Sequence, residues 1–206
     1  MKFSIGIPTL NRIDLLNPSL KKYEIDFPDV EKHIIDNGRQ SSYLLSKDCS
    51  YFIANENYGV AKSWNYLCSK IFEKNDYALI LNDDIYLGAT KTDIENLIKQ
   101  KPDKLIKATP DWCAFIMPKS VYQRIGKFDE CFYPAYYEDK SYEYRVKLAG
   151  LSIIKSPILN PVVYKTSQTL EFMPSIHELS KKNKKKYIEM WGGEPEREKF
   201  KTPYNK

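Results

Sequence analysis

Short apolar runs that end in polar residues recur along the first half of the chain. Lys2–Ile7, His33–Ile35 and Tyr51–Ala54 are mostly apolar, and Ala78–Leu81 is apolar throughout. Runs of this length without alternation are typical of parallel strands that are buried on both faces. We therefore predict four strands, of which the first and the last are buried, and they lead into Pro8-Thr9, Asp36-Asn37, Asn55 and Asn82-Asp83-Asp84.

Segments with helical spacing lie between the predicted strands. Apolar residues recur every three or four positions within Val60–Phe72, and Leu10–Tyr23 has a similar pattern. This alternation indicates an α/β fold, with a Rossmann-like, mostly parallel central sheet and helices on both faces. The right-handed crossover rule places the strand 78–81 beside the first strand. Later in the chain we expect a helix over Thr92–Lys101, a strand over Cys113–Met117, and a helix over Glu138–Ala149 that ends at Gly150.

Two carboxylates stand at the end of the most apolar run, where Asp83 and Asp84 follow Leu81 and Asn82. In open α/β sheets, ligands bind at the carboxyl ends of the strands. Mg²⁺ and similar hard cations are commonly held by one or two carboxylates together with substrate phosphates. The sequence therefore predicts a divalent metal site, with Mn²⁺ or Mg²⁺, and a nucleotide-type substrate.

Length and composition fit one globular domain. The chain has 206 residues, of which 42% are hydrophobic and 29% are charged, which is enough to bury a core. We assign residues 1–193 to a single domain, and the polar residues 194–206 to a C-terminal tail or a linker within a longer chain. No apolar run approaches the roughly 18 to 20 residues that span a bilayer, and the N-terminus lacks a signal-peptide core, so we predict a cytoplasmic protein.

Charge and cysteine content narrow the possible partners. The net charge is +5, and Lys181–Lys186 is rich in lysine. Such a run is typical of a solvated helix face, and its other interpretation is peripheral contact with an anionic membrane surface. Aromatic residues are not interleaved with it, so no nucleic acid partner is expected. The four cysteines lack close pairs and the chain has 2 histidines, so we expect reduced, mostly buried thiols and no zinc cluster.

A series of short motifs extends over most of the chain. It begins with Ile7-Pro8-Thr9-Leu10-Asn11-Arg12, Asp36-Asn37-Gly38, Asn57-Tyr58-Gly59-Val60-Ala61 and Trp64-Asn65. It continues with Asn82-Asp83-Asp84, Gly126-Lys127-Phe128-Asp129-Glu130, Tyr137-Glu138-Asp139 and Arg145, and ends at Trp191-Gly192-Gly193. In its order and spacing this series resembles the family-2 type of GT-A glycosyltransferases, which use nucleotide-sugar donors. The resemblance implies the GT-A fold.

The resemblance also implies roles for the donor side. Asp84 matches the last aspartate of the family's D-x-D motif, which binds a Mn²⁺ or Mg²⁺ ion at the donor diphosphate, and Asp83 would assist it directly or through water. Asp36 matches the residue that hydrogen-bonds the nucleobase. Lys165 stands where many members have a metal-binding histidine, and its charge would contact the diphosphate. The donor-binding residues implied in this way are Pro8, Thr9, Asn11, Arg12, Asp36, Asn57, Asn65, Asn82, Asp83 and Lys165.

On the acceptor side, Glu138 and Asp139 resemble the family's catalytic E-D pair. Asp139 would be the general base, because a sugar hydroxyl attacks well only when its proton is removed. The alternative is that both acids only stabilise the start of the helix, where negative charge is favourable. Trp112, together with Tyr133, Tyr136 and Tyr137, is expected to form a stacking wall for an acceptor sugar, with Asp111 binding hydroxyls. Core packing would explain these aromatic residues equally well.

The function implied is inverting, metal-assisted transfer of a sugar from a UDP- or dTDP-linked donor to a hydroxyl of a glycan or another acceptor. A nucleotidyltransferase is one alternative, although the segment after the first strand lacks the glycines of a phosphate-binding loop. A nucleotide-sugar-binding module that has lost catalysis is the other alternative. Asn82 and Lys165, which depart from the family pattern, keep that second possibility open.

Overall fold

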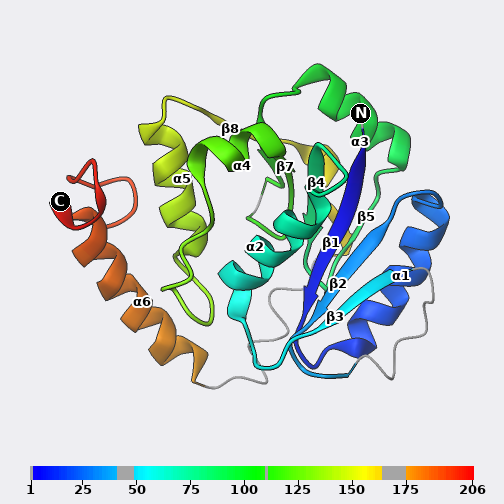
Figure 1. Cartoon of the computed structure of the whole chain (residues 1–206), viewed down its shortest axis with the longest axis horizontal. Helices are drawn as coiled ribbons and strands as arrows, with labels where there is room; N and C mark the ends of the chain where they lie inside the picture. Colours follow the sequence, from blue (N-terminus) through cyan, green and yellow to red (C-terminus); the bar gives the residue numbers. More distant parts are fainter. Residues whose placement is uncertain (1, 41–48, 110, 164–174) are drawn as a thin grey trace.

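Seven strands of the described residues, which are 2–40, 49–109, 111–163 and 175–206 of the computed structural model, form one sheet at the centre of the molecule (Figure 1). Their order is β3-β2-β1-β4-β7-β6-β8. β7 runs antiparallel to both neighbours, and all other neighbouring pairs are parallel. The bounds are β1 Phe3–Thr9, β2 Lys32–Asp36, β3 Cys49–Ile53, β4 Tyr77–Leu81, β6 Leu105–Lys107, β7 Ala114–Pro118 and β8 Ile153–Lys155. A smaller sheet pairs β5 (Tyr86–Leu87) with β9 (Pro161–Val163).

Helices cover both faces of the large sheet, as the sequence predicts (Figure 1). One hydrophobic core lies between the sheet and the helices α1 (Ile13–Asp26) and α3 (Lys91–Gln100). A second core lies between the opposite face and the helices α2 (Gly59–Ile71), α4 (Lys119–Ile125) and α5 (Glu138–Leu148). The strand β4 supplies both cores, because its side chains point alternately to the two faces.

Close packing fixes α2 against the centre of the sheet. A Cβ atom at Gly6 of β1 would lie 2.8 Å from Cδ1 of Ile80 and 3.2 Å from Cβ of Leu67. Only glycine leaves room for α2 to approach the strand so closely. The start of α2 is thereby held at the carboxyl edge of the strands.

The predicted strands of the first half are confirmed, and β4 lies beside β1 as expected. The first helix begins later than predicted, at Ile13, because Asn11 adopts the left-handed backbone conformation with φ 56°. The short elements that were not predicted include β5, β6, α4 and β8. Each has seven residues or fewer, which is too short for a clear periodic pattern.

A third, smaller hydrophobic cluster joins α5 to α6 (Ile176–Trp191). Residues of the C-terminal segment also contact these helices: Tyr144 donates a hydrogen bond to the carbonyl oxygen of Phe200 at 2.8 Å. The amide of Phe200 in turn donates to the carbonyl oxygen of Trp191 at 3.1 Å. The segment predicted to be a tail therefore packs on the helix pair, and the domain boundary at residue 193 remains a prediction.

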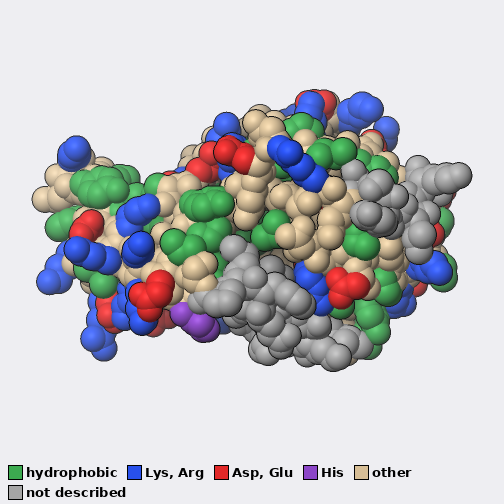
Figure 2. Space-filling model, turned by 90° about the horizontal axis from the view of Figure 1, so that it is seen from below, with side chains coloured by type: hydrophobic (Ala, Val, Ile, Leu, Met, Phe, Trp, Pro, Cys, Tyr) green, Lys and Arg blue, Asp and Glu red, His purple; other side chains and the backbone are tan. Residues whose placement is uncertain are grey.

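Lysines of α6 lie on the surface near the C-terminus, where Figure 2 shows Lys and Arg side chains with Asp and Glu side chains among them. Several are paired: Lys181 with Glu178 at 2.8 Å and Lys184 with Glu194 at 2.8 Å. Exposed pairs of this kind contribute little stability. Contact of this run with a membrane remains a prediction, and no helix in the described ranges is long and apolar enough to cross one.

The four cysteines are free, and their reduced state remains a prediction. Cys68 and Cys113 are buried, Cys49 is half-buried, and Cys131 is exposed. The exposed position of Cys131 departs from the expectation that most of these thiols are buried.

Candidate active site

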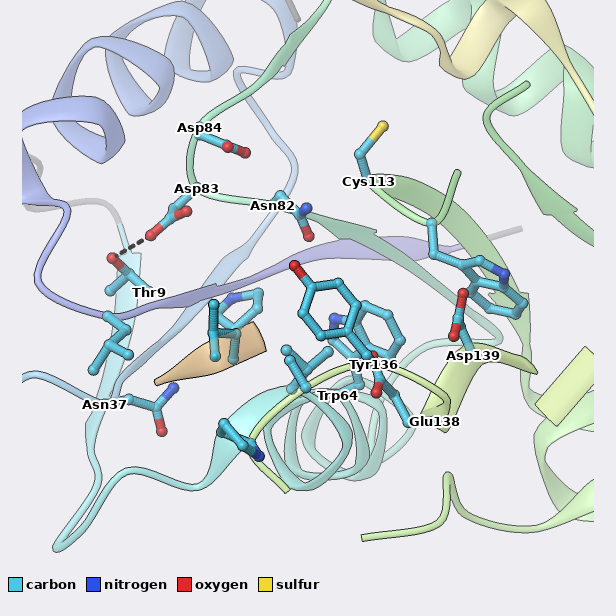
Figure 3. A pocket seen from close by; sticks show the side chains of 18 of the residues that line it. Thr9, Asn37, Trp64, Asn82, Asp83, Asp84, Cys113, Tyr136, Glu138 and Asp139 are labelled. Atoms are coloured by element: carbon cyan, nitrogen blue, oxygen red, sulfur yellow. Dashed lines mark hydrogen bonds between the residues drawn. The ribbon is translucent and has the colours of Figure 1, made fainter. Parts of the chain in front are cut away.

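A cavity of about 280 Å³ opens at the carboxyl edge of β1, β2 and β4. Residues that follow these strands form one wall, and the residues before and at the start of α5 form another (Figure 3). Its lining residues are Pro8, Thr9, Leu10, Asn37, Asn57, Gly59, Val60, Trp64, Asn82, Asp83, Asp84, Asp111, Trp112, Cys113, Pro134, Ala135, Tyr136, Glu138, Asp139 and Ile176. The cavity thus brings together residues from both halves of the sequence. It lies at the edge of the sheet where ligands bind in folds of this kind.

The first acidic pair of the cavity, Asp83 and Asp84, follows β4. Thr9, the last residue of β1, donates a hydrogen bond from its hydroxyl to Oδ2 of Asp83 at 2.7 Å (Figure 3). Asp83 is 7% exposed. Its burial, with a smaller contribution from the charge of Asp84, raises the pKa of Asp83 to about 7. A buried carboxylate with a raised pKa is a common mark of a functional site.

The donor set of this pair fits a hard divalent cation. Two neighbouring carboxylates supply oxygen ligands, and a cation would compensate the charge that burial disfavours at Asp83. Within the described ranges, no three His, Cys, Asp or Glu side chains gather into a metal site.

The second acidic pair, Glu138 and Asp139, begins α5 on the other wall of the cavity. Glu138 is 5% exposed, and its Oε2 atom has no hydrogen-bond partner in the described part of the chain. Burial, reinforced by the charge of Asp139, raises the pKa of Glu138 well above its ordinary value. Burial also raises the pKa of Asp139, although the positive charges of Lys140 and Lys107 oppose this shift.

An irregular turn directs this pair into the cavity. Tyr136 and Tyr137, just before α5, both have the left-handed backbone conformation, with φ 73° and φ 75°. This region is uncommon for bulky residues and is often found at functional sites. Tyr137 is the N-cap residue and its side chain makes no capping hydrogen bond. Oδ1 of Asp139 accepts a hydrogen bond from the amide of Lys140 at 2.8 Å. This carboxylate therefore also contacts the backbone at the start of the helix, as the alternative interpretation of the sequence proposed.

Trp112 lies between the cavity and the second core. It is 5% exposed and packs among aromatic rings, with Trp64 at 6.0 Å and Phe115 at 5.0 Å between ring centroids. Its indole N–H donates to Glu143 of α5 at 2.8 Å. Core packing therefore accounts for most of this side chain, and only an edge lines the cavity where an open stacking wall was expected.

Another part of the cavity is built around Asn37 and Asn57. Asn37 accepts the amide of Tyr58 at 2.9 Å, and Asn57 accepts the amide of Gly59 at 2.8 Å. Gly59 has φ +69°, and a Cβ atom there would lie 2.6 Å from the carbonyl oxygen of Pro134. The amide of Val60 donates to that same oxygen at 2.8 Å, which joins the start of α2 to the opposite wall.

The structure brings most of the predicted site residues to the cavity. Those lining it are Pro8, Thr9, Asn57, Asn82, Asp83, Asp84, Asp111, Trp112, Glu138 and Asp139. Those outside its lining are Asn11, Arg12, Asp36, Asn65 and Tyr137. Lys165 lies outside the described residues.

Local contacts explain the five predicted residues outside the lining. Arg12 is buried and pairs with Asp14 at 3.0 Å, and Asn11 is exposed beside Gly38. Asp36 is fully buried, and its Oδ1 accepts the amide of Gly38 at 2.9 Å.

Asn65 and Tyr137 serve the packing of the fold. Asn65 donates to the carbonyl oxygen of Phe128 and to Glu130, both at 2.9 Å, and accepts the amide of Phe128 at 2.8 Å. The ring of Tyr137 lies 5.6 Å from that of Tyr187 in the cluster between α5 and α6. Neither side chain is directed at the cavity.

Ten residues that line the cavity were not in the predicted site, and three of them, Asn37, Tyr136 and Ile176, show why. Asn37 is the first residue after β2, a position that could have been inferred because strand ends face the ligand edge. From the sequence, Tyr136 was expected only as one of several aromatic residues in an acceptor wall. Ile176 begins α6, and nothing in its sequence neighbourhood indicates proximity to the sheet edge.

Solved structures with a similar fold are known, whereas no protein-family model and no curated protein matches the sequence. The mannosyltransferase PcManGT of Pyrobaculum calidifontis, in complex with GDP-Man and Mn²⁺, has a TM-score of 0.67 and 13% identity, over 91% of this chain and 64% of that one. GalNAc-T7 with UDP, GalNAc and Mn²⁺ has a TM-score of 0.71 and 11% identity, over 93% of this chain and 48% of that one. Glucosyl-3-phosphoglycerate synthase from Mycobacterium tuberculosis, with Mn²⁺ and UDP, has a TM-score of 0.58 and 10% identity, over 87% and 76%.

Proposed function

We propose that this chain, which has the GT-A glycosyltransferase fold, transfers a sugar from a nucleoside-diphosphate sugar to a hydroxyl of a glycan or another acceptor. The fold agrees with the expectation from the sequence motifs. The observation that carries the proposal is that two acidic pairs, 83–84 and 138–139, line a single cavity at the ligand edge of the sheet. One pair suits a metal-bound diphosphate, and the other suits removal of a proton.

On the donor side, Asp84 and Asp83 would hold the divalent cation, with Thr9 orienting Asp83 through its hydrogen bond. When bound, Mn²⁺ or Mg²⁺ would offset the negative charge that develops on the leaving diphosphate. Asn37 and Asn57 border the same cavity and would contact the nucleoside. The structural neighbours solved with Mn²⁺ and a nucleotide or nucleotide sugar support this arrangement.

On the acceptor side, Asp139 is the proposed general base. The acceptor oxygen attacks the anomeric carbon while the bond between that carbon and the diphosphate oxygen breaks, and the hydroxyl proton passes to the carboxylate of Asp139. Attack opposite the leaving group inverts the anomeric configuration. The raised pKa of Asp139 supports this role, because a more basic carboxylate removes a proton more effectively.

The identity of the donor nucleotide is proposed separately from the reaction class. The sequence resemblance favours a uridine or thymidine diphosphate. The neighbouring structures contain UDP in two cases and GDP-Man in another. This chain spans 64% of PcManGT and 48% of GalNAc-T7. The substrates of those longer proteins therefore serve only as candidates for a donor panel.

A thermal-shift panel of UDP-, dTDP- and GDP-sugars, with and without MnCl₂, tests the proposal. A donor at about 100 times its Kd stabilises the folded state by about 2.7 kcal/mol, which raises the Tm by several degrees. We expect such a shift with Mn²⁺ and release of nucleoside diphosphate on incubation. The variant Asp84→Ala should lose the Mn²⁺-dependent shift. Stabilisation without any release, even with acceptor glycans added, would instead identify a binding module that lacks catalysis.

A further inference from the structure

Tyr136 and Tyr137 share one backbone conformation but have different surroundings. Tyr136 lines the cavity, whereas the ring of Tyr137 packs 5.6 Å from that of Tyr187 in the cluster between α5 and α6. Two successive left-handed residues, with φ 73° and φ 75°, thus direct Tyr136 and Glu138 into the cavity and the residue between them away from it. Strain of this kind persists where the surrounding structure compensates for it, typically at functional sites.

Tyr136 lies between the two acidic walls of the cavity. In Figure 3 its ring is drawn between Asn82, at the end of β4, and Glu138, and its hydroxyl points toward Asn82. In the proposed reaction the sugar lies between the diphosphate, held at 83–84, and the base Asp139. Tyr136 and Glu138 therefore border the space that the sugar occupies.

Both side chains present polar atoms without a protein partner. Among the described residues, neither the hydroxyl of Tyr136 nor Oε2 of Glu138 has a hydrogen-bond partner, and Glu138 is only 5% exposed. Leaving the buried Oε2 of Glu138 unpaired is costly, so a ligand that pairs it is favoured, and the half-buried Tyr136 lines the cavity where it can contact the same ligand. Sugar hydroxyls both donate and accept hydrogen bonds, and this matches a phenol and a carboxyl group.

Electrostatics supports this match. Burial, together with the charge of Glu138, raises the pKa of Tyr136, so its phenol stays protonated. Burial raises the pKa of Glu138 as well, so this carboxyl group tends to keep its proton and can donate as well as accept.

We infer that Tyr136 and Glu138 recognise the transferred sugar by hydrogen-bonding its hydroxyls and thereby select among hexose epimers. This inference rests on the proposed function and assigns sugar selection to two residues of one turn. A site with buried polar groups discriminates strongly against ligands that leave them unpaired. The nucleotide and diphosphate contacts, on the other wall of the cavity, are independent of this selection.

Calorimetric titration of Tyr136→Phe and Glu138→Gln, with Tyr137→Phe as the matched control, tests the inference. The probes are UDP, UDP-glucose and UDP-galactose, with GDP and GDP-mannose in parallel, all in MnCl₂. We expect both cavity variants to bind the preferred sugar nucleotide about 10-fold more weakly, and to bind the free nucleoside diphosphate as the wild type does. The preference between UDP-glucose and UDP-galactose should shrink by a similar factor. Tyr137→Phe should match the wild type with every probe.

The outcomes separate this inference from the proposed function. Unchanged sugar affinity and unchanged epimer preference in both cavity variants would overturn the inference and leave the proposed function intact. An equal loss of affinity for the free diphosphate would also overturn it, because the contact would then be with the nucleotide. A wild-type protein that binds none of the probes would contradict the proposed function, and the inference with it.

Discussion

The two acidic pairs of the cavity differ in how the fold positions them. Asp83 lies two residues after the end of β4 and accepts a hydrogen bond from Thr9 of the neighbouring strand. Glu138 follows a turn of two left-handed tyrosines, and its Oε2 has no partner within the described ranges. Paired strands thus position the first pair, and an irregular turn that packs against α6 positions the second. Donor binding and catalysis should therefore be separable by mutation.

Both acidic pairs lower the stability of the folded state at neutral pH. Burial raises the pKa of Asp83 to about 7 and raises that of Glu138 well above its ordinary value. At neutral pH the folded protein therefore tends to hold protons on these carboxyl groups that the unfolded chain loses, which lowers its stability. Carboxylates that only stabilise a fold show the opposite shift, and Glu143 is an example. Burial raises the pKa of Glu143, but the hydrogen bond from Trp112 and the charges of Lys140 and Lys107 lower it by more, so the net shift is downward. The contrast favours a functional origin for both pairs.

The largest effect is expected for Asp139→Asn, which removes the proposed base and keeps the shape of the side chain. Turnover, measured as release of nucleoside diphosphate at saturating donor, should fall about 10² to 10⁴-fold, with the donor Kd unchanged. The exposed Asp103 provides the control, and Asp103→Asn should keep the wild-type rate. If Asp139→Asn retains more than about a tenth of the activity, the base lies elsewhere.

A smaller effect is expected for Thr9→Val, which removes the hydroxyl that orients Asp83. Loss of a hydrogen bond to a metal ligand typically weakens metal binding about 10 to 100-fold, so the Mn²⁺ concentration that half-saturates donor binding should rise by that factor. The exposed Thr92 of α3 provides the control variant Thr92→Val. An unchanged Mn²⁺ requirement would show that Thr9 does not organise the metal site.

The smallest effect is expected in stability, for Glu138→Gln. Because the folded-state pKa of Glu138 is raised, the folded protein holds a proton that the unfolded chain loses, and stability falls as pH rises through that window. Glutamine cannot lose a proton, so the variant should be more stable than the wild type by about 1 to 2 kcal/mol at pH 8 and equal to it near pH 4. Urea denaturation at the two pH values measures this difference.

Glu143→Gln, on the same helix, provides the opposite control. The pKa of Glu143 is lowered in the folded state, so its contribution to stability is present above the unfolded-state pKa and is lost as pH falls. This variant should be less stable than the wild type at pH 8. A destabilised Glu138→Gln at pH 8 would mean that the carboxylate has a stabilising partner.

The same contrast explains which parts of the site the sequence could predict. Asp83 and Asp84 follow an apolar run, and parallel strands place their carboxyl ends at one edge, so the position of this acidic pair follows from local pattern. The direction of a side chain after an irregular turn does not follow from a local pattern. Tyr136 and Tyr137 are identical neighbours in the sequence, and only the backbone angles at 136–137 decide which one faces the cavity.

Tertiary packing decided the remaining differences. Trp112 was expected on an open wall, but neighbouring aromatic rings and Glu143 bury it. Asn65 was expected at the donor, but the segment that contains Phe128 and Glu130 uses its amide group. The hydrogen bonds of Trp112 with Glu143 and of Asn65 with Phe128 and Glu130 join residues more than 30 positions apart, and a local pattern carries no information about them.

Donor titration by calorimetry in MnCl₂, followed by assay of nucleoside diphosphate release, tests the division of roles most directly when it is applied to the wild type, Asp84→Ala and Asp139→Asn. We predict that the wild type binds and turns over the donor, that Asp139→Asn binds it equally well without turnover, and that Asp84→Ala loses the Mn²⁺-dependent binding. Binding by the wild type without turnover, or an equal loss of binding in both variants, would contradict the account.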